Sequence, residues 1–288
     1  MTIVDGALQW NEHPDPEPWD TELVVAVHGA GINNADLMQR LGFYPAPPGW
    51  PQDIPGMEFA GEVVATGRRC TRFSVGDRVM AVVGGGAQAE LAVVDESCAM
   101  AVPPDVAWPE AGGFPEAFTT AYDALFTQCR MAVGDRVLVT GAAGGVGSAA
   151  VQLAAATAGP DEALGLGPFD VVLELVGAGS LPAVVAAMAL GGRIAVIGVG
   201  GGAQVEVDLL AIMQRRLHIS GSTLRSRSLV DKAVVAAAVE HHVVPLLRAR
   251  KVRVPLQATM SMDRAEDAYA HFAESGKLGK IVLVPPSP

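Results

Sequence analysis

The feature that most constrains this chain is a strand, a glycine turn and a helix in direct succession between residues 136 and 156. Residues 136–140 (RVLVT) form a β-branched run typical of a buried parallel strand, and residues 148–156 favour a helix. Between them, GAAGGVG fits a G-x-G-x-x-G pattern with alanine in its first place. Free N–H groups at a helix start bind pyrophosphate and glycines let it approach, so this order predicts a dinucleotide-binding turn. Its predicted binding residues are Ala142, Gly144, Gly145, Val146 and Gly147. The alternative is a tight connection that binds nothing.

Composition excludes several classes of protein. The 288 residues carry a net charge of −11, whereas nucleic-acid binding needs a basic patch, so we expect no nucleic-acid partner. The three cysteines share no metal-like spacing and no signal peptide is visible, so we expect a cytoplasmic protein without disulfides. The most apolar windows are short and interrupted, so we expect no membrane partner.

The chain changes character near residue 108. Before it, short strands separated by Gly- and Pro-rich turns predict an irregular β-barrel or sandwich; they cover residues 23–27, 61–65, 78–83 and 90–94. After it, apolar strands alternate with helices, which predicts a parallel sheet with helices on both faces. These strands cover residues 171–176, 193–197 and 217–220, and the helices cover 116–129, 181–189, 208–216 and 229–242. The tail adds a helix at 263–275 and a strand at 280–284.

Three segments carry a family resemblance. They are residues 31–44 (GINNADLMQRLGFY), residues 55–67 (PGMEFAGEVVATG) and residues 119–125 (TTAYDAL), the last followed by the glycine turn. In this order the chain resembles the quinone oxidoreductase (zeta-crystallin-like) branch of the medium-chain dehydrogenase/reductase superfamily. The resemblance implies an α/β protein with a GroES-like β-rich catalytic domain at residues 1–113 and 253–288. It also implies a Rossmann doubly wound parallel sheet at residues 114–252, and an active site in the cleft between the domains.

The same segments predict an enzyme without zinc. In zinc-dependent relatives the second segment carries a histidine directly before the glutamate, and the first carries a cysteine. Here Met57 precedes Glu58, and residues 31–44 contain no cysteine. The cysteine-rich lobe that holds a structural zinc is also missing. Because zinc needs three or four nitrogen, sulfur or carboxylate ligands in one place, we expect no metal site.

Without a Lewis acid, the easier reaction is hydride delivery to an acceptor that is already electron-poor. The resemblance implies NADPH as the cofactor and quinones or related conjugated carbonyls as substrates. The protein then aligns the reactants and donates hydrogen bonds to the developing oxyanion. An enoyl-thioester or enone reductase would use the same cleft, and a non-catalytic, crystallin-like cofactor-binding protein is an alternative of another class.

By family position, Asn33 and Tyr44 are the predicted catalytic residues, and Thr120 lies against the nicotinamide. Asn33 could instead cap a turn, and Tyr44 could be a rim tyrosine packed on neighbouring prolines.

The carboxyl ends of the predicted strands should hold the rest of the cofactor, because ligands bind there in open α/β sheets. The residues concerned are Val176, Gly177, Gly198, Val199, Gly200, Leu224 and Arg225. Arg225 could equally be a solvated loop charge, and Lys280 is a weaker candidate. Strands 193–197 and 217–220 are apolar and near the presumed sheet edge, so we expect a homodimer formed there.

One expected part of the Rossmann sheet is missing. About fourteen residues separate Ala156 from the strand that begins at Val171, too few for the strand–helix–strand that builds the adenosine half. Asp161 and Glu162 stand where an acidic residue usually binds the adenosine ribose, but the residues before them are no strand. We therefore expect roughly 25–35 further residues here, outside this numbering, enough for a strand–helix–strand insert. The alternative is a true deletion, which would leave a weak cofactor binder.

Overall fold

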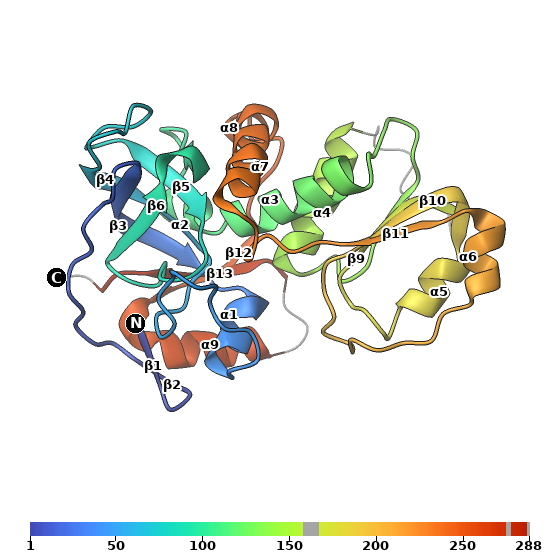
Figure 1. The fold of residues 1–288 in the computed structure, drawn as a ribbon, viewed down its shortest axis with the longest axis horizontal. Coiled ribbons are helices and arrows are strands. Elements are labelled where there is room, and N and C mark those ends of the chain that lie inside the picture. The colour runs from blue at the N-terminus through green and yellow to red at the C-terminus, as the bar shows by residue number, and fades with distance from the viewer. Residues whose placement is uncertain (158–166, 275–277, 287–288) are drawn as a thin grey trace. The chain divides into compact units, whose positions relative to one another are not determined.

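A computed structural model describes residues 1–157, 167–274 and 278–286 of the chain. The chain divides into two compact units (Figure 1). Unit 1 comprises Met1–Thr119 and Leu224–Pro288, and unit 2 comprises Thr120–Thr223. Both ends of the chain thus build unit 1, and unit 2 is inserted between them, as the family resemblance implies.

A largely antiparallel sheet forms the centre of unit 1. Its strand order is β12-β13-β3-β4-β5-β7, and β6 also pairs with β3. The strands are β3 (Glu22–Gly31), β4 (Glu58–Thr66), β5 (Arg78–Val82), β6 (Leu91–Asp95), β7 (Ala99–Ala101), β12 (Leu256–Ser261) and β13 (Lys280–Val284). Near the C-terminus, β13 pairs antiparallel with the end of β3, Val282 lying opposite Gly31. This pairing brings the beginning of β13 to the segment that follows β3.

Helices and one hairpin cover this sheet. They are β1 (Thr2–Val4), β2 (Ala7–Gln9), α1 (Asn34–Arg40), η1 (Glu96–Cys98), α2 (Trp108–Gly112), α7 (Leu229–His242), α8 (Val244–Arg248), η3 (Met262–Arg264) and α9 (Ala265–Ala273). α3 (Pro115–Tyr122) begins in unit 1 and ends in unit 2. The core joins both ends of the chain, because Leu23 and Phe59 belong to the same buried cluster as Tyr269 and Ile281.

Unit 2 contains a four-stranded parallel sheet in the order β11-β10-β9-β8. Its elements are η2 (Asp123–Gln128), β8 (Val137–Val139), α4 (Gly145–Thr157), β9 (Phe169–Glu174), α5 (Leu181–Ala186), β10 (Met188–Val196), α6 (Leu209–Arg215) and β11 (His218–Gly221). Val172 and Ile194 of the strands pack with Val184 and Val185 of α5 in its apolar core. The predicted α/β class, with a GroES-like part and a Rossmann-like parallel sheet, is therefore confirmed.

The second boundary between the units differs from the sequence prediction. The resemblance places residues 224–252 in the Rossmann part, and their helix continues its alternating pattern, yet they belong to unit 1. Glu240 of α7 explains the difference, because it accepts a hydrogen bond from the Ala101 backbone and forms an ion pair with Arg72, both in unit 1. The first boundary lies at Thr119 instead of residue 113, within α3.

The parallel sheet ends at β11 on one side and, among the described residues, at β8 on the other. Of the two strands predicted near the edge, β11 forms the edge, and residues 193–196 belong to β10, which lies between β9 and β11. Most of the short connection after α4, residues 158–166, lies outside the described residues, so the two explanations for its length stay open. No helix in the described part of the chain is long and apolar enough to cross a membrane.

Candidate active site

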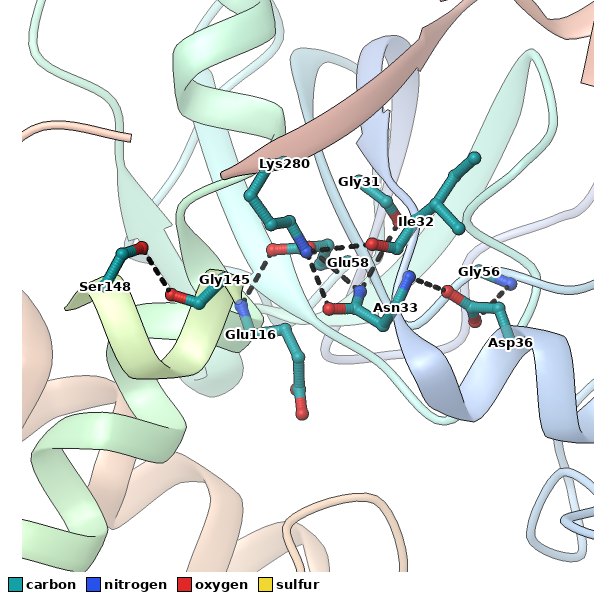
Figure 2. Close-up of polar contacts among 10 residues, drawn as sticks. All are labelled: Gly31, Ile32, Asn33, Asp36, Gly56, Glu58, Glu116, Gly145, Ser148 and Lys280. Carbon is teal, nitrogen blue, oxygen red and sulfur yellow. Dashed lines mark hydrogen bonds and ion pairs between the residues drawn. The ribbon is translucent and has the colours of Figure 1, made fainter. Parts of the chain in front are cut away.

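A buried polar network joins four segments of unit 1 that are far apart in the sequence (Figure 2). Lys280, at the start of β13, donates from Nζ to Asn33 Oδ1 at 2.6 Å, to Glu58 Oε1 at 2.5 Å and to the Ile32 carbonyl at 3.1 Å. Asn33 Nδ2 donates to Glu58 Oε1 at 2.9 Å, and the Glu116 backbone donates to Glu58 Oε2 at 2.8 Å. Lys280 is 3% exposed and Glu58 is fully buried. Each ammonium proton therefore has an acceptor, as a buried cation requires.

The sequence leaves room for this network at Gly31. A Cβ at that position would overlap the Glu58 carboxylate and come within 3.1 Å of Lys280 Cε. A glycine at the end of β3 is therefore what allows the lysine and the glutamate to approach each other beside the strand.

Asn33 is the N-cap residue of α1, with an extended backbone at φ −124° and ψ 158°. Its backbone N–H donates to Asp36 Oδ2 at 2.8 Å, and the Gly56 N–H donates to Asp36 Oδ1 at 3.1 Å. Asp36 is fully buried, and burial raises its pKa to about 6. Asn33 thus occupies the capping position that the sequence allowed, while its amide is directed to Glu58 and Lys280.

Tyr44 lies in a loop that Arg225 fixes. The Arg225 guanidinium donates to the Tyr44 carbonyl at 2.9 Å, to the Gly84 carbonyl at 2.8 Å and to the Gln39 side chain. Its carbon lies 5.1 Å from the centre of the Tyr44 ring, a cation–π distance. Arg225 is 1% exposed, so the alternative of a solvated loop charge is wrong. Burial raises the pKa of the half-buried Tyr44, which therefore keeps its hydroxyl proton at neutral pH.

In unit 2 the glycine turn has the geometry that its sequence predicts. A Cβ at Gly147 would overlap the Gly141 carbonyl, so the turn itself requires that glycine. At Gly144 a Cβ would meet only the Gly141 carbonyl, at an ordinary 3.6 Å. The fold does not demand glycine at Gly144, and its open side is free for a ligand to approach. α4 begins directly after it and leaves its first backbone N–H groups without partners inside the helix.

One carboxylate organises the two strand ends beside this turn. Glu174, at the end of β9, is fully buried, and its Oε1 accepts hydrogen bonds from the backbones of Val176 and Gly177 at 2.7 and 2.8 Å. The same oxygen accepts from the hydroxyls of Thr140 and Ser180 at 2.9 and 2.7 Å. Glu174 thereby fixes the end of β8 against the loop that follows β9.

The loops after β9 and β10 lie against each other. A Cβ at Gly177 would come within 2.7 Å of the Gly202 carbonyl and 2.9 Å of Val199 Cα, and Gly198 packs equally tightly on Leu175. Gly200, in contrast, has no neighbour within 4 Å of an added Cβ. The predicted cofactor residues at these strand ends are therefore packed closely together, and Gly200 is the one among them with open space beside it.

The structure brings some predicted site residues together within each unit. Tyr44 and Arg225 are neighbours in unit 1, where the buried Leu224 also lies, and the glycine turn and strand ends belong to unit 2. Thr120 is buried on α3. Sequence reasoning missed Glu174, although a charged residue at the end of the apolar run VVLEL was a usable signal, and it undervalued Lys280.

Two family descriptions match the chain. "Alcohol dehydrogenase GroES-like domain" covers residues 19–104, and "Zinc-binding dehydrogenase" covers residues 145–283. The chain belongs to the medium-chain dehydrogenase/reductase superfamily.

Within this superfamily, the chain is similar to proteins named quinone oxidoreductase. It is 27% identical to the quinone oxidoreductase of Lama guanicoe, over 93% of this chain and 90% of that protein. It is 32% identical to polyketide synthase GfsB of Streptomyces halstedii, over 91% of this chain but only 5% of that protein. The chain also spans about a third of some further relatives. Among solved structures, CurK enoyl reductase shares the fold, with a TM-score of 0.81 and 21% identity over 99% of this chain and 97% of that one.

Proposed function

We propose that this chain reduces quinones and related conjugated carbonyls with hydride from NADPH and without zinc. The observation that carries the proposal is the buried ammonium of Lys280, which is bonded to the side chains of Asn33 and Glu58. Both residues lie in the two motifs in which zinc-dependent relatives carry their cysteine and histidine. In this chain those motifs therefore surround a fixed cation supplied by the protein.

The donor set does not fit zinc. Met57 stands where a zinc ligand would be expected, and the amide oxygen of Asn33 already accepts a hydrogen bond from Lys280. A second cation beside that ammonium would be repelled in a site with little water. Among the described residues, no group of three or more His, Cys, Asp or Glu side chains is arranged to bind a metal.

The residues of unit 2 fit the nicotinamide end of a dinucleotide. Gly144 and Gly200 leave open positions, the α4 N-terminus can bind phosphate, and the loops after β9 and β10 offer backbone groups. Such a cofactor, when bound, supplies the hydride. The preference for NADPH comes from the family resemblance alone.

The chain's own contribution to the chemistry is then orientation and hydrogen bonding. Hydride addition to a quinone transfers one hydrogen with two electrons and gives a resonance-stabilised anion, which takes up one proton to become the hydroquinone. Tyr44 is the candidate donor to that oxyanion, because it remains protonated and its loop is fixed by Arg225. Such an acceptor does not need strong polarisation by a metal.

An enoyl-thioester reductase is the second candidate. The 32% identity to a polyketide synthase over 91% of this chain favours it, since enoyl thioesters are also conjugated carbonyls that accept hydride. A non-catalytic cofactor-binding protein is the third.

One assay separates the three. The full chain would be mixed with NADPH and either 1,4-benzoquinone, 9,10-phenanthrenequinone or a crotonyl thioester, and oxidation followed at 340 nm with and without EDTA. We expect turnover with the quinones that EDTA does not change. Faster turnover of the thioester would favour the enoyl reductase, and turnover of neither would favour the binding protein. Activity lost with EDTA and restored by zinc would contradict the zinc-free mechanism.

A further inference from the structure

A doubly wound dinucleotide domain has two halves, one on each side of the strand that leads into the glycine turn. In this chain that strand is β8, and β9, β10 and β11 follow on one side of it only. On its other side, the described residues contribute no strand. The half that accompanies the nicotinamide is therefore complete, and the half that accompanies the adenosine has no strand in the described part of the chain.

The length of the chain leads to the same conclusion independently of any conformation. α4 ends at Thr157 and β9 begins at Phe169, which leaves eleven residues between them. A parallel crossover alone takes a dozen or more residues, and the missing half needs a strand, a helix and a second strand. The alignment with the Lama guanicoe enzyme covers 306 positions, more than the 288 residues of this chain, so that relative has residues that this chain lacks.

Charge adds a third observation. The adenosine half normally carries the acidic residue that binds the ribose hydroxyl, or the arginine that accommodates the 2′-phosphate of NADP. Residues 137–192 contain no lysine, arginine or histidine. The stretch that would recognise a 2′-phosphate therefore contains no cation.

What remains fits a smaller ligand. The α4 N-terminus can bind one phosphate, and the open side of Gly144 lets that phosphate approach the backbone. The strand ends held by Glu174 and the open Gly200 would then hold a ribose and a nicotinamide.

We propose that this chain recognises only the nicotinamide mononucleotide half of its cofactor and does not discriminate NADPH from NADH. This inference rests on the proposed function, since it assigns the cofactor class of the same site, and it takes the short connection after α4 as a true deletion. Reduced nicotinamide mononucleotide should then serve about as well as either dinucleotide.

The test is a binding experiment on the full chain. Isothermal titration calorimetry would compare NADP⁺, NAD⁺ and nicotinamide mononucleotide, and a competition series would add 2′,5′-ADP, which represents the adenosine half. We expect the three dissociation constants to agree within about fivefold, a difference of about 1 kcal/mol. We expect 2′,5′-ADP at millimolar concentration not to displace nicotinamide mononucleotide.

Variants locate the site. Gly144→Val fills the open side of the turn and should weaken all three ligands by about tenfold or more, an effect of about 1.4 kcal/mol. Gly221→Ala is the control, because a Cβ on β11 would meet nothing closer than the Val196 carbonyl at 3.9 Å. It should leave binding unchanged.

NADP⁺ that binds more than tenfold tighter than the mononucleotide, or displacement by 2′,5′-ADP, would overturn the inference. An absence of binding by all three nucleotides would overturn it as well. Equal binding without quinone turnover would leave the inference standing and refute the proposed function. Quinone turnover with a strong preference for NADPH would overturn the inference and leave the proposed function standing.

Discussion

The ammonium nitrogen of Lys280 lies 2.6 Å from the side-chain oxygen of Asn33, although the two residues are 247 positions apart in the chain. This bond decides which way the Asn33 amide points, because its oxygen must face the lysine and its nitrogen must face Glu58. The first motif after β3 and the last strand of the chain are therefore coupled through one buried network.

Lys280→Met should destabilise the protein strongly. It removes the partner of the buried Glu58 carboxylate, and breaking a buried ion pair on one side costs about 3–5 kcal/mol. The double variant Lys280→Met/Glu58→Gln should lose less than the sum of the two single variants. Urea unfolding of the wild type, the two single variants and the double variant measures this coupling. Lys251→Met, at an exposed lysine, is the control. Additive single losses would show that the pair is not coupled.

Tyr44→Phe should lower quinone turnover by up to about 100-fold without unfolding the protein, because it removes one preorganised donor to an oxyanion. Tyr269→Phe is the matched control, which should change stability and not turnover. Its buried hydroxyl donates to Gln88 Oε1 at 2.9 Å, so the change should cost about 1 kcal/mol of stability and leave kcat unchanged. Steady-state kinetics and thermal unfolding together check both. Unchanged kinetics in Tyr44→Phe would remove Tyr44 from the reaction.

Arg225→Met should reduce both stability and turnover, since three acceptors, two at residues 39–44 and one at Gly84, lose their donor. Loss of hydrogen bonds from a buried charged group costs about 1.5–3 kcal/mol each. Arg225→Lys should recover only part of the loss, because a lysine cannot reproduce the planar fork. Hydrogen exchange of the backbone at residues 39–44 and 84 reports whether the loop loosens, and Arg248→Met, at an exposed arginine, is the control. Protection unchanged in the Arg225 variants would show that the loop is fixed by other contacts.

Local signals in the sequence were sufficient for many elements. The predicted helix 229–242 coincides with α7, because Ser228 caps it by accepting a hydrogen bond from the Asp231 backbone at 3.2 Å. The strand 280–284 coincides with β13, whose apolar run is almost entirely buried. The glycine turn was recognisable because Gly147 is required by the turn itself.

Contacts between distant segments could not be read from local patterns. α7 continues the helix–strand alternation of the Rossmann part, and its contacts with distant residues such as Arg72 and Ala101 show that it belongs to unit 1. Lys280 looked like an ordinary charge at a strand start, since nothing near it in sequence indicates Asn33 or Glu58. Arg225 was misjudged as a possible solvated charge for the same reason, because its acceptors lie between residues 39 and 84.

The chain should form a homodimer through the β11 edge of unit 2. Ile219 on β11 is 40% exposed, and Leu209, Leu210 and Met213 of the neighbouring α6 are 57–71% exposed. Pairing of two β11 strands would satisfy edge backbone groups and cover these apolar side chains. Light scattering at micromolar concentration should give twice the chain mass, and Ile219→Lys should give the monomer. Val133→Lys, at an exposed turn position before β8, should leave the dimer intact. A wild-type monomer would refute the prediction.

Asp36 should make stability fall as the pH rises through mildly acidic values. Burial raises its pKa from 3.8 to about 6, while the Asn33 N–H, Lys280 and Arg225 oppose that rise and Glu58 adds to it. Between about pH 4 and pH 6 the folded protein therefore keeps a proton that the unfolded chain has already released. Stability linked to this group is greatest below that window and declines across it, and above pH 6 the burial of the charge costs its full amount.

In Asp36→Asn this titration is absent, so the stability of the wild type minus that of the variant should decline from about pH 4 to about pH 6 and then stay level. Urea unfolding at closely spaced pH values measures the difference, with Asp5→Asn, at an exposed turn residue, as the control. A difference that is flat with pH, or that grows as the pH rises, would show that Asp36 is ionised in the folded protein throughout.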